Sequence, residues 1–75
     1  MDWSKLSLPE EATLTRLHNF MYMDGGKNYI LEINEYGDGR FVGYAELTND
    51  DSTQFAPANG SSIEECISNL VKNFG

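Results

Sequence analysis

Two side chains of this chain are of types that nucleophilic and metal chemistry commonly use: its single cysteine, Cys66, and its single histidine, His18. A thiol beside an imidazole can act as a nucleophile with its base when both open onto a cleft. Cys66, however, falls on the apolar stripe of a predicted helix, and a buried thiol is usually inert. One Cys and one His also cannot complete a closed zinc site without carboxylates. We therefore expect a structural Cys66 and no metal or other cofactor.

Carboxylates gather around a predicted hairpin and the loop that follows it: Glu32, Glu35, Asp38, Glu46, Asp50 and Asp51. The segment TNDDST is rich in oxygen ligands but lacks the alternating positions and terminal Glu of a calcium loop, so a solvated turn is expected. The run GGKNY lacks the spacing of a phosphate-binding loop. These patterns favour a protein that is not an enzyme.

The segment SSIEECISNLVKNFG predicts the element that carries Cys66. Its apolar residues recur at helical spacing and form one stripe: Ile63, Cys66, Ile67, Leu70, Val71 and Phe74. Ser61 or Ser62 can cap this helix, with Glu64 or Glu65 three residues further on. Gly75 suits a cap at the other end.

A hairpin is predicted in NYILEINEYGDGRFVGYAELT, where apolar residues alternate with a period of two. A two-residue loop would place Leu31 opposite Glu46, whereas a three-residue loop over 37–39 places Leu31 opposite Ala45 and keeps one face apolar. The second register also puts Gly39 at a left-handed position, where glycine fits best. Its pairs are Tyr36–Arg40, Ile33–Gly43, Leu31–Ala45 and Tyr29–Leu47.

A second hairpin is predicted upstream, in FMYMDGGKNY, with Gly25 and Gly26 as its loop. This register sets Phe20 opposite Leu31. Downstream, NDDS predicts a turn and TQFAPA a short fourth strand, which Pro57 would confine to an edge because proline has no N–H to donate. Ser7-Leu8-Pro9-Glu10 is typical of a helix start, and we predict a short helix over residues 8–17.

The predicted fold is therefore α+β: one domain over residues 1–75, with a three- or four-stranded antiparallel sheet, the C-terminal helix on one face and a short N-terminal helix. The predicted front face, under the C-terminal helix, carries Phe20, Tyr22, Tyr29, Leu31, Ile33, Phe41, Ala45 and Leu47. Gly43 and Ala45 would let the helix approach closely.

The opposite side of the sheet, which we call the back face, is too apolar for full contact with water and is the candidate partner-binding surface. Its predicted residues are Met21, Met23, Ile30, Glu32, Tyr36, Val42, Tyr44 and Glu46. Methionine and tyrosine suit adaptable contact surfaces. We favour cover by the N-terminal segment, through Trp3, Leu6, Leu8, Leu14 and Leu17, because so short a chain needs a second core layer. Cover by a partner or a second copy is the alternative.

The net charge of −7, from twelve acidic and five basic residues, disfavours direct binding to nucleic acid. It is compatible with a basic protein partner, although solubility alone also explains it. With one cysteine there is no intrachain disulfide, as expected in a reducing cytoplasm. The N-terminus does not have the pattern of a secretory signal, and no apolar run is long enough to cross a membrane.

From Tyr29 to Phe74 the order of sequence motifs, a hairpin followed by a strand end and a capped helix, resembles that of the small antitoxin domains of the HicB type. YILEINEYGDGRFVGYAEL is similar to their opening hairpin, and ANGSSIEECISNLVKNF is similar to their last strand end, glycine, capping serine and helix. The resemblance implies a cytosolic, oligomeric, non-catalytic protein that blocks a basic, RNA-acting partner.

Three functional interpretations follow. The first is an acidic binding protein that inhibits a nucleic-acid-handling protein, as antitoxins and phage-borne anti-CRISPR proteins do. The second is a structural or regulatory homodimer whose back faces pair, with no inhibitory role. The third, an enzyme using Cys66 and His18, has no motif in its favour.

Overall fold

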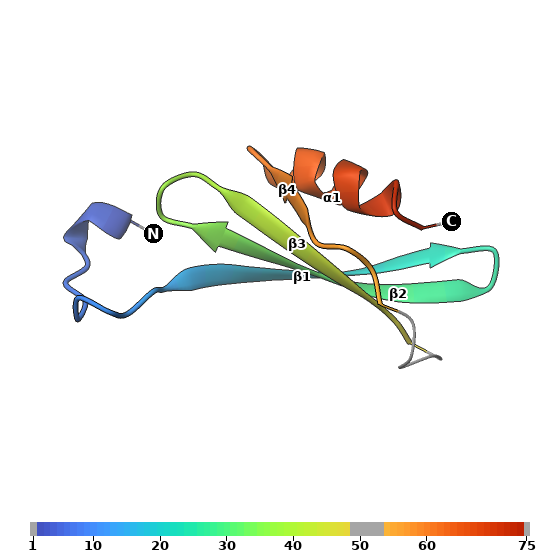
Figure 1. Cartoon of the computed structure of the whole chain (residues 1–75), viewed down its shortest axis with the longest axis horizontal. Helices are drawn as coiled ribbons and strands as arrows, with labels where there is room; N and C mark the ends of the chain where they lie inside the picture. The colour runs from blue at the N-terminus through green and yellow to red at the C-terminus, as the bar shows by residue number, and fades with distance from the viewer. Residues whose placement is uncertain (1, 49–53, 75) are drawn as a thin grey trace.

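The computed structural model describes residues 2–48 and 54–74 and has the predicted α+β architecture (Figure 1). Its four strands form one antiparallel sheet in the order β1-β2-β3-β4, and the helix α1 packs on one face of that sheet. The elements are the 3-10 turn η1 (Trp3–Lys5), β1 (Thr15–Asp24), β2 (Lys27–Tyr36), β3 (Phe41–Leu47), β4 (Ala58–Gly60) and α1 (Ile63–Val71).

Both predicted hairpin registers are confirmed. Across the β1–β2 turn Asp24 lies opposite Lys27, and the two loop residues, Gly25 and Gly26, have φ of 57° and 87°. Across the β2–β3 turn the Tyr36 N–H donates to the Arg40 carbonyl at 2.9 Å, which closes the three-residue loop. Gly39 there has φ of 94°, a conformation that side chains with a Cβ rarely adopt. Glycine placement and period-two alternation thus set the sheet register.

The predicted helix over residues 8–17 is wrong. A single turn at Glu10–Glu11, where the Ala12 N–H donates to the Pro9 carbonyl, is followed by extended chain, and β1 begins at Thr15. Thr15 lies opposite Tyr36, so the first hairpin has ten residues in each strand. The β-branched threonine favours this extended backbone, and pairing with β2 outweighs the local helix-start signal.

The predicted fourth strand is shifted along the chain. Residues 54–57 are irregular and β4 runs from Ala58 to Gly60, directly after Pro57. Proline cannot donate to a ladder, so pairing with β3 starts one residue later, with Ala58 opposite Gly43. The strand lies at the sheet edge, as predicted. Thr53 and the predicted turn at NDDS lie outside the described residues, as does Gly75, the predicted helix cap.

The start of α1 is fixed by its caps. The Ser62 hydroxyl accepts from the Glu65 N–H at 3.1 Å, and the Glu65 carboxylate accepts from the Ser61 N–H at 3.0 Å. The helix ends at Val71, before the last residue of the predicted stripe. Phe74, beyond the helix, still turns toward the sheet and stacks on Tyr29, with ring centroids 4.2 Å apart and nearly parallel planes.

The helix lies directly on the sheet backbone at two glycines. A Cβ added at Gly43 would come within 2.9 Å of the Cys66 Sγ, and one at Gly60 would come within 2.6 Å of the Cys66 backbone N. The side chains of Cys66, Leu31, Ile33 and Leu70 are almost fully buried in this contact. The close approach predicted at Gly43 is confirmed, and Gly60 adds a second point.

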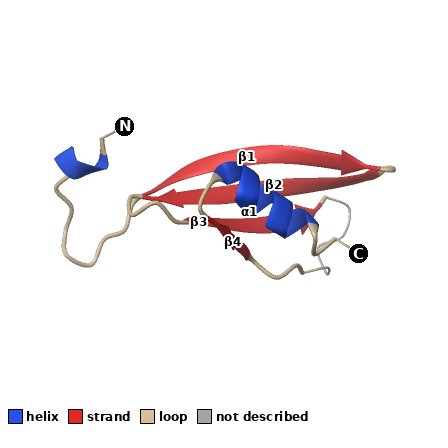
Figure 2. Cartoon of the chain, turned by 90° about the horizontal axis from the view of Figure 1, so that it is seen from above, coloured by secondary structure: helices blue, strands red, loops and turns tan. Residues whose placement is uncertain are grey.

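The helix covers less of the front face than predicted. It packs against β2, β3 and β4 and leaves β1 uncovered (Figure 2). Phe20, predicted to lie under the helix, is therefore 40% exposed. Tyr22 is half-buried, because Phe74 beyond the helix lies against its ring. The two glycines hold the helix over β3 and β4, so the far edge of the sheet is out of its reach.

Substitution of Gly60 by alanine should destabilise the fold, because the added methyl meets the backbone of α1 rather than a movable side chain. We expect a loss of about 1–3 kcal/mol in the free energy of unfolding, the usual cost of overpacking. Urea denaturation followed by circular dichroism measures it. Asn59→Ala, at the exposed neighbouring residue, is the control and should stay within about 0.5 kcal/mol of the wild type. Equal stability of the two variants would contradict the close contact.

Candidate protein-binding surface

All eight residues predicted for the back face lie on one side of the sheet, opposite α1. Leu31 and Ile33 face the helix, so their neighbours Ile30 and Glu32 face away from it. Cross-strand pairing extends this side into rows, one holding Asn19, Glu32 and Tyr44 and the next Met21, Ile30 and Glu46. Met23, Tyr36 and Val42 are each separated from these residues by an even number of positions along their strands, so their side chains point to the same side.

The back face is exposed rather than covered by the N-terminal segment. Met23 is 70% and Met21 53% exposed, Ile30 and Tyr44 are also exposed, and Tyr36 and Val42 are half-buried. The segment before β1 runs past the end of the sheet (Figure 1). There Trp3 lies against Gly37, in the β2–β3 turn.

The predicted cover by the N-terminal segment is therefore wrong. The large apolar residues of this segment, Leu6, Leu8 and Leu14, are themselves exposed. Leu17, the last residue of the predicted cover, is part of β1 and lies on the back face. Because β1 extends to Thr15, the preceding chain leaves the sheet at its end and does not cross the back face (Figure 1).

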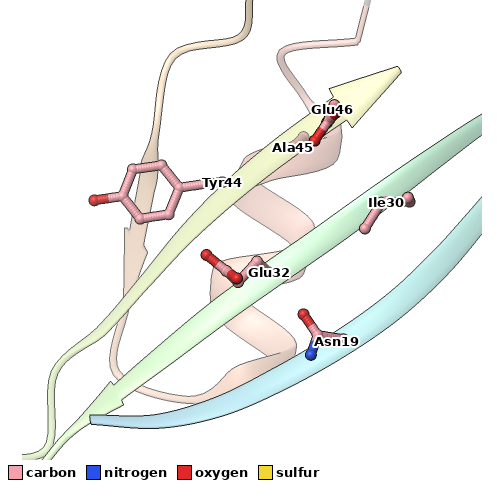
Figure 3. A pocket seen from close by; sticks show the side chains of 6 residues that line it. All are labelled: Asn19, Ile30, Glu32, Tyr44, Ala45 and Glu46. Carbon is pink, nitrogen blue, oxygen red and sulfur yellow. The ribbon is translucent and has the colours of Figure 1, made fainter. Parts of the chain in front are cut away.

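A shallow depression of about 170 Å³ lies in the middle of this face, lined by Asn19, Ile30, Glu32, Tyr44, Ala45 and Glu46 (Figure 3). Glu32 stands between Asn19 of β1 and Tyr44 of β3. Glu46 is the diagonal neighbour of Glu32 on the adjacent strand. Four of the eight predicted residues thus meet in one depression that combines two carboxylates with an aromatic ring.

The charges of this face are of one sign. The strand residues that point to it include Glu32 and Glu46 and no Lys or Arg. Neither carboxylate forms a salt bridge within residues 2–48 and 54–74. The nearby Arg40, in the β2–β3 turn, lies over the Tyr36 ring at 4.5 Å and pairs with Asp38 at 2.8 Å. Hydrogen bonds from Arg40 lower the pKa of Asp38, so this cation is already matched by a carboxylate.

Sequence reasoning missed two residues of the surface, Leu17 and Asn19. Both continue the period-two pattern of Met21 and Met23 toward the N-terminus, and Leu17 is exposed on the same side. The alternation is present in the sequence, but the predicted helix over 8–17 took in Leu17, and the predicted strand began only at Phe20, after Asn19. Thr15 closes this end of the face, where its hydroxyl donates to the Asn34 side chain at 3.2 Å.

The structure does not bring Cys66 and His18 together. Cys66 is fully buried over Gly43, its Sγ 3.6 Å from the Ala58 carbonyl, and burial raises the pKa of its thiol. His18, on β1, lies in the same cross-strand row as Gly43. The buried Ile33 of β2 lies between them. Its Nε2 lies 2.8 Å from the Glu35 carboxylate, as a hydrogen-bonded pair on the helix side of the sheet.

The described part of the chain holds no group of three or more His, Cys, Asp or Glu side chains arranged for a metal ion. Asp50 and Asp51, which the sequence places in an oxygen-rich loop, lie outside it. Within the same residues, no helix combines the length and hydrophobicity needed to cross a membrane. Comparison with known proteins adds no further constraint, because no family model, curated protein or solved structure matches the chain.

Cys66 should resist thiol reagents in the folded protein, because it is buried and its thiol pKa is raised. We expect a colorimetric disulfide reagent at pH 8 to react with it at least about a hundredfold more slowly than after unfolding in guanidinium, since reaction then requires opening of the fold. The variant Met23→Cys is the positive control and should gain one thiol that reacts at once in the folded state. Rapid labelling of Cys66 in the wild type would contradict its burial.

Proposed function

We propose that this protein is a non-catalytic binding protein whose back face docks on a basic surface of a nucleic-acid-handling protein and inhibits it. The observation that carries the proposal is the exposed apolar face with two carboxylates, Glu32 and Glu46, that lack an intrachain cation among the described residues. An apolar patch of this kind on a small protein typically marks an interaction site.

The chemistry of the face suits a partner that presents Arg or Lys. Met21, Met23 and Ile30 offer apolar area that adapts to the partner, since methionine side chains are flexible and polarizable. The Glu32 and Glu46 carboxylates would receive a guanidinium or ammonium group in the depression, with the Tyr44 ring beside it. Proteins that handle nucleic acid carry such cations where phosphates bind.

The net charge of −7 supports the same assignment. An acidic molecule is attracted to a basic groove over a distance of about one Debye length, which raises its association rate. Once bound there, it would compete directly with nucleic acid for the same cations. We therefore place the protein, as a proposal, among antitoxins and phage-borne inhibitors of defence nucleases such as anti-CRISPR proteins, acting in the cytoplasm.

A homodimer joined through its back faces is the alternative. It would bring Glu32 and Glu46 of both copies into one apolar interface to which these strands contribute no Lys or Arg. Desolvated carboxylates without partners cost several kcal/mol per charge. The face is therefore better suited to a basic protein than to a second copy of itself.

Affinity capture from a lysate of the source organism tests the proposal. The wild-type bait should retain a basic, nucleic-acid-binding protein, and Glu32→Lys/Glu46→Lys should lose it. Glu10→Lys/Glu11→Lys is the matched control, because it makes the same change in net charge at exposed residues far from the face and should capture normally. Mass spectrometry of the eluates identifies the retained proteins.

Inhibition is then measured with the captured protein after purification. Wild type and control should suppress its nucleic-acid binding or cleavage, and the back-face variant should be at least about tenfold weaker, which corresponds to about 1.4 kcal/mol. Reversal of charges at a desolvated contact commonly costs more than this. Recovery of no basic protein, or equal inhibition by all three baits, would refute the assignment.

A further inference from the structure

Strand β1 is a long edge strand whose outer side is open. It is the first strand in the sheet order and pairs only with β2 among the described residues. The helix lies over the other strands and the N-terminal segment leaves beyond the sheet end, so neither covers this edge (Figure 2). In an antiparallel ladder, alternate residues direct their N–H and C=O groups away from the partner strand. Half of the β1 backbone groups therefore face outward.

This edge lacks the devices that usually keep edge strands from pairing. Residues 17–23 read LHNFMYM, with no Pro, no Gly and no Lys, Arg, Asp or Glu. The other edge, β4, is three residues long and follows Pro57 directly. Short length and proline are common ways to protect an edge, and an exposed long uncharged edge favours pairing with another chain. The β4 edge is thus protected against pairing with another chain, whereas the β1 edge is not.

We propose that two copies of the protein pair through β1, antiparallel about a twofold axis at Phe20, and so continue the sheet from four strands to eight. Charge complementarity points to a second copy as the occupant. The strand carries Arg16 near its start and Asp24 at its end, both exposed and on the same side of the sheet. About this axis, Arg16 of each copy lies opposite Asp24 of the other, and the pair occurs twice.

The backbone permits this register. A two-residue hairpin loop makes Asp24 and Lys27 a hydrogen-bonded pair, so even-numbered β1 residues face β2 and odd-numbered ones face outward. Allowed registers between two β1 strands therefore differ by steps of two residues. The neighbouring registers set Arg16 opposite Tyr22 or beyond the strand end, at Gly26. Only the register centred on Phe20 matches both charges.

Pairing of this kind leaves both back faces on the same side of one sheet. Leu17 of one copy lies opposite Met23 of the other, and Asn19 lies opposite Met21, so the exposed apolar band continues across the seam. The inference goes beyond the proposed function and does not depend on it, because it concerns the purified protein alone. A basic partner can bind the back face whether or not two copies pair.

Cysteine cross-linking tests the register. The two Phe20 residues form a pair without backbone hydrogen bonds, with Cα atoms about 4.5 Å apart, which is within disulfide range. Phe20→Cys should therefore yield a disulfide-linked dimer under mild oxidation on a non-reducing gel. In Met23→Cys, the control, the two cysteines are offset by six residues, about 20 Å, and should not cross-link. The native Cys66 is buried in both variants.

The mass in solution tests the pairing itself. Wild type in light scattering should approach twice its chain mass of 8.4 kDa as concentration rises. Arg16→Glu places a carboxylate opposite the Asp24 carboxylate of the other copy and should shift the protein to the single-copy mass. The double variant Arg16→Glu/Asp24→Arg restores opposite charges and should restore the dimer. Circular dichroism checks that each variant keeps its fold.

Two results would overturn the proposal: a single-copy mass for wild type at every concentration, or equal cross-linking of Phe20→Cys and Met23→Cys. The first is also the result expected if β1 accepts a strand of a different protein. If a charge variant unfolds, the wild-type mass and the cysteine pair still decide. These measurements contain no basic partner. A negative result would therefore refute the pairing through β1 and leave the capture experiment to test the proposed function.

Discussion

The contact of Cys66 with Gly43 and Gly60 is the constraint on which the rest of the structure depends. At these two points the helix lies on bare backbone, and a Cβ would meet the Cys66 backbone at Gly60 and the Ile33 and Cys66 side chains at Gly43. The contact lets Leu70 reach Leu31 and Ile33 and form the fully buried centre. It also sets the helix over β2, β3 and β4. The Cys66 side chain is thus a small buried group at the tightest point of the fold.

One helix cannot cover both faces of a four-stranded sheet. On the helix side, only a few residues are buried. A cluster of four aromatic rings extends the core toward the first hairpin: Tyr22, Tyr29, Phe55 and Phe74. The opposite side keeps its methionines, isoleucine and tyrosine in water. A chain of 75 residues also buries a smaller fraction of its surface on folding than a larger domain does. The apolar area that stays outside the core on this side is the area that the proposed partner would cover.

The hairpins and the faces were predictable from the sequence because the signals are local. Glycines at 25, 26 and 39 define the loops, and period-two alternation then assigns each strand residue to a side. The N-terminal third was not predictable in the same way. Ser7 and Pro9 favour a helix locally, but Thr15 pairs with Tyr36, a residue distant in sequence. Whether the back face is covered depends on the path of residues 2–14, which no local pattern specifies.

The position of Trp3 has a consequence for spectroscopy. It is the only tryptophan in the chain, and it packs on Gly37 at the turn, held by a short 3-10 turn whose Asp2 cap accepts from Ser4. Its emission therefore reports on whether the N-terminal arm is docked against the β2–β3 turn. The core contains tyrosine and phenylalanine instead, with Tyr29 stacked on Phe74 at its edge. Tryptophan and tyrosine signals will follow separate events if the arm detaches before the sheet opens.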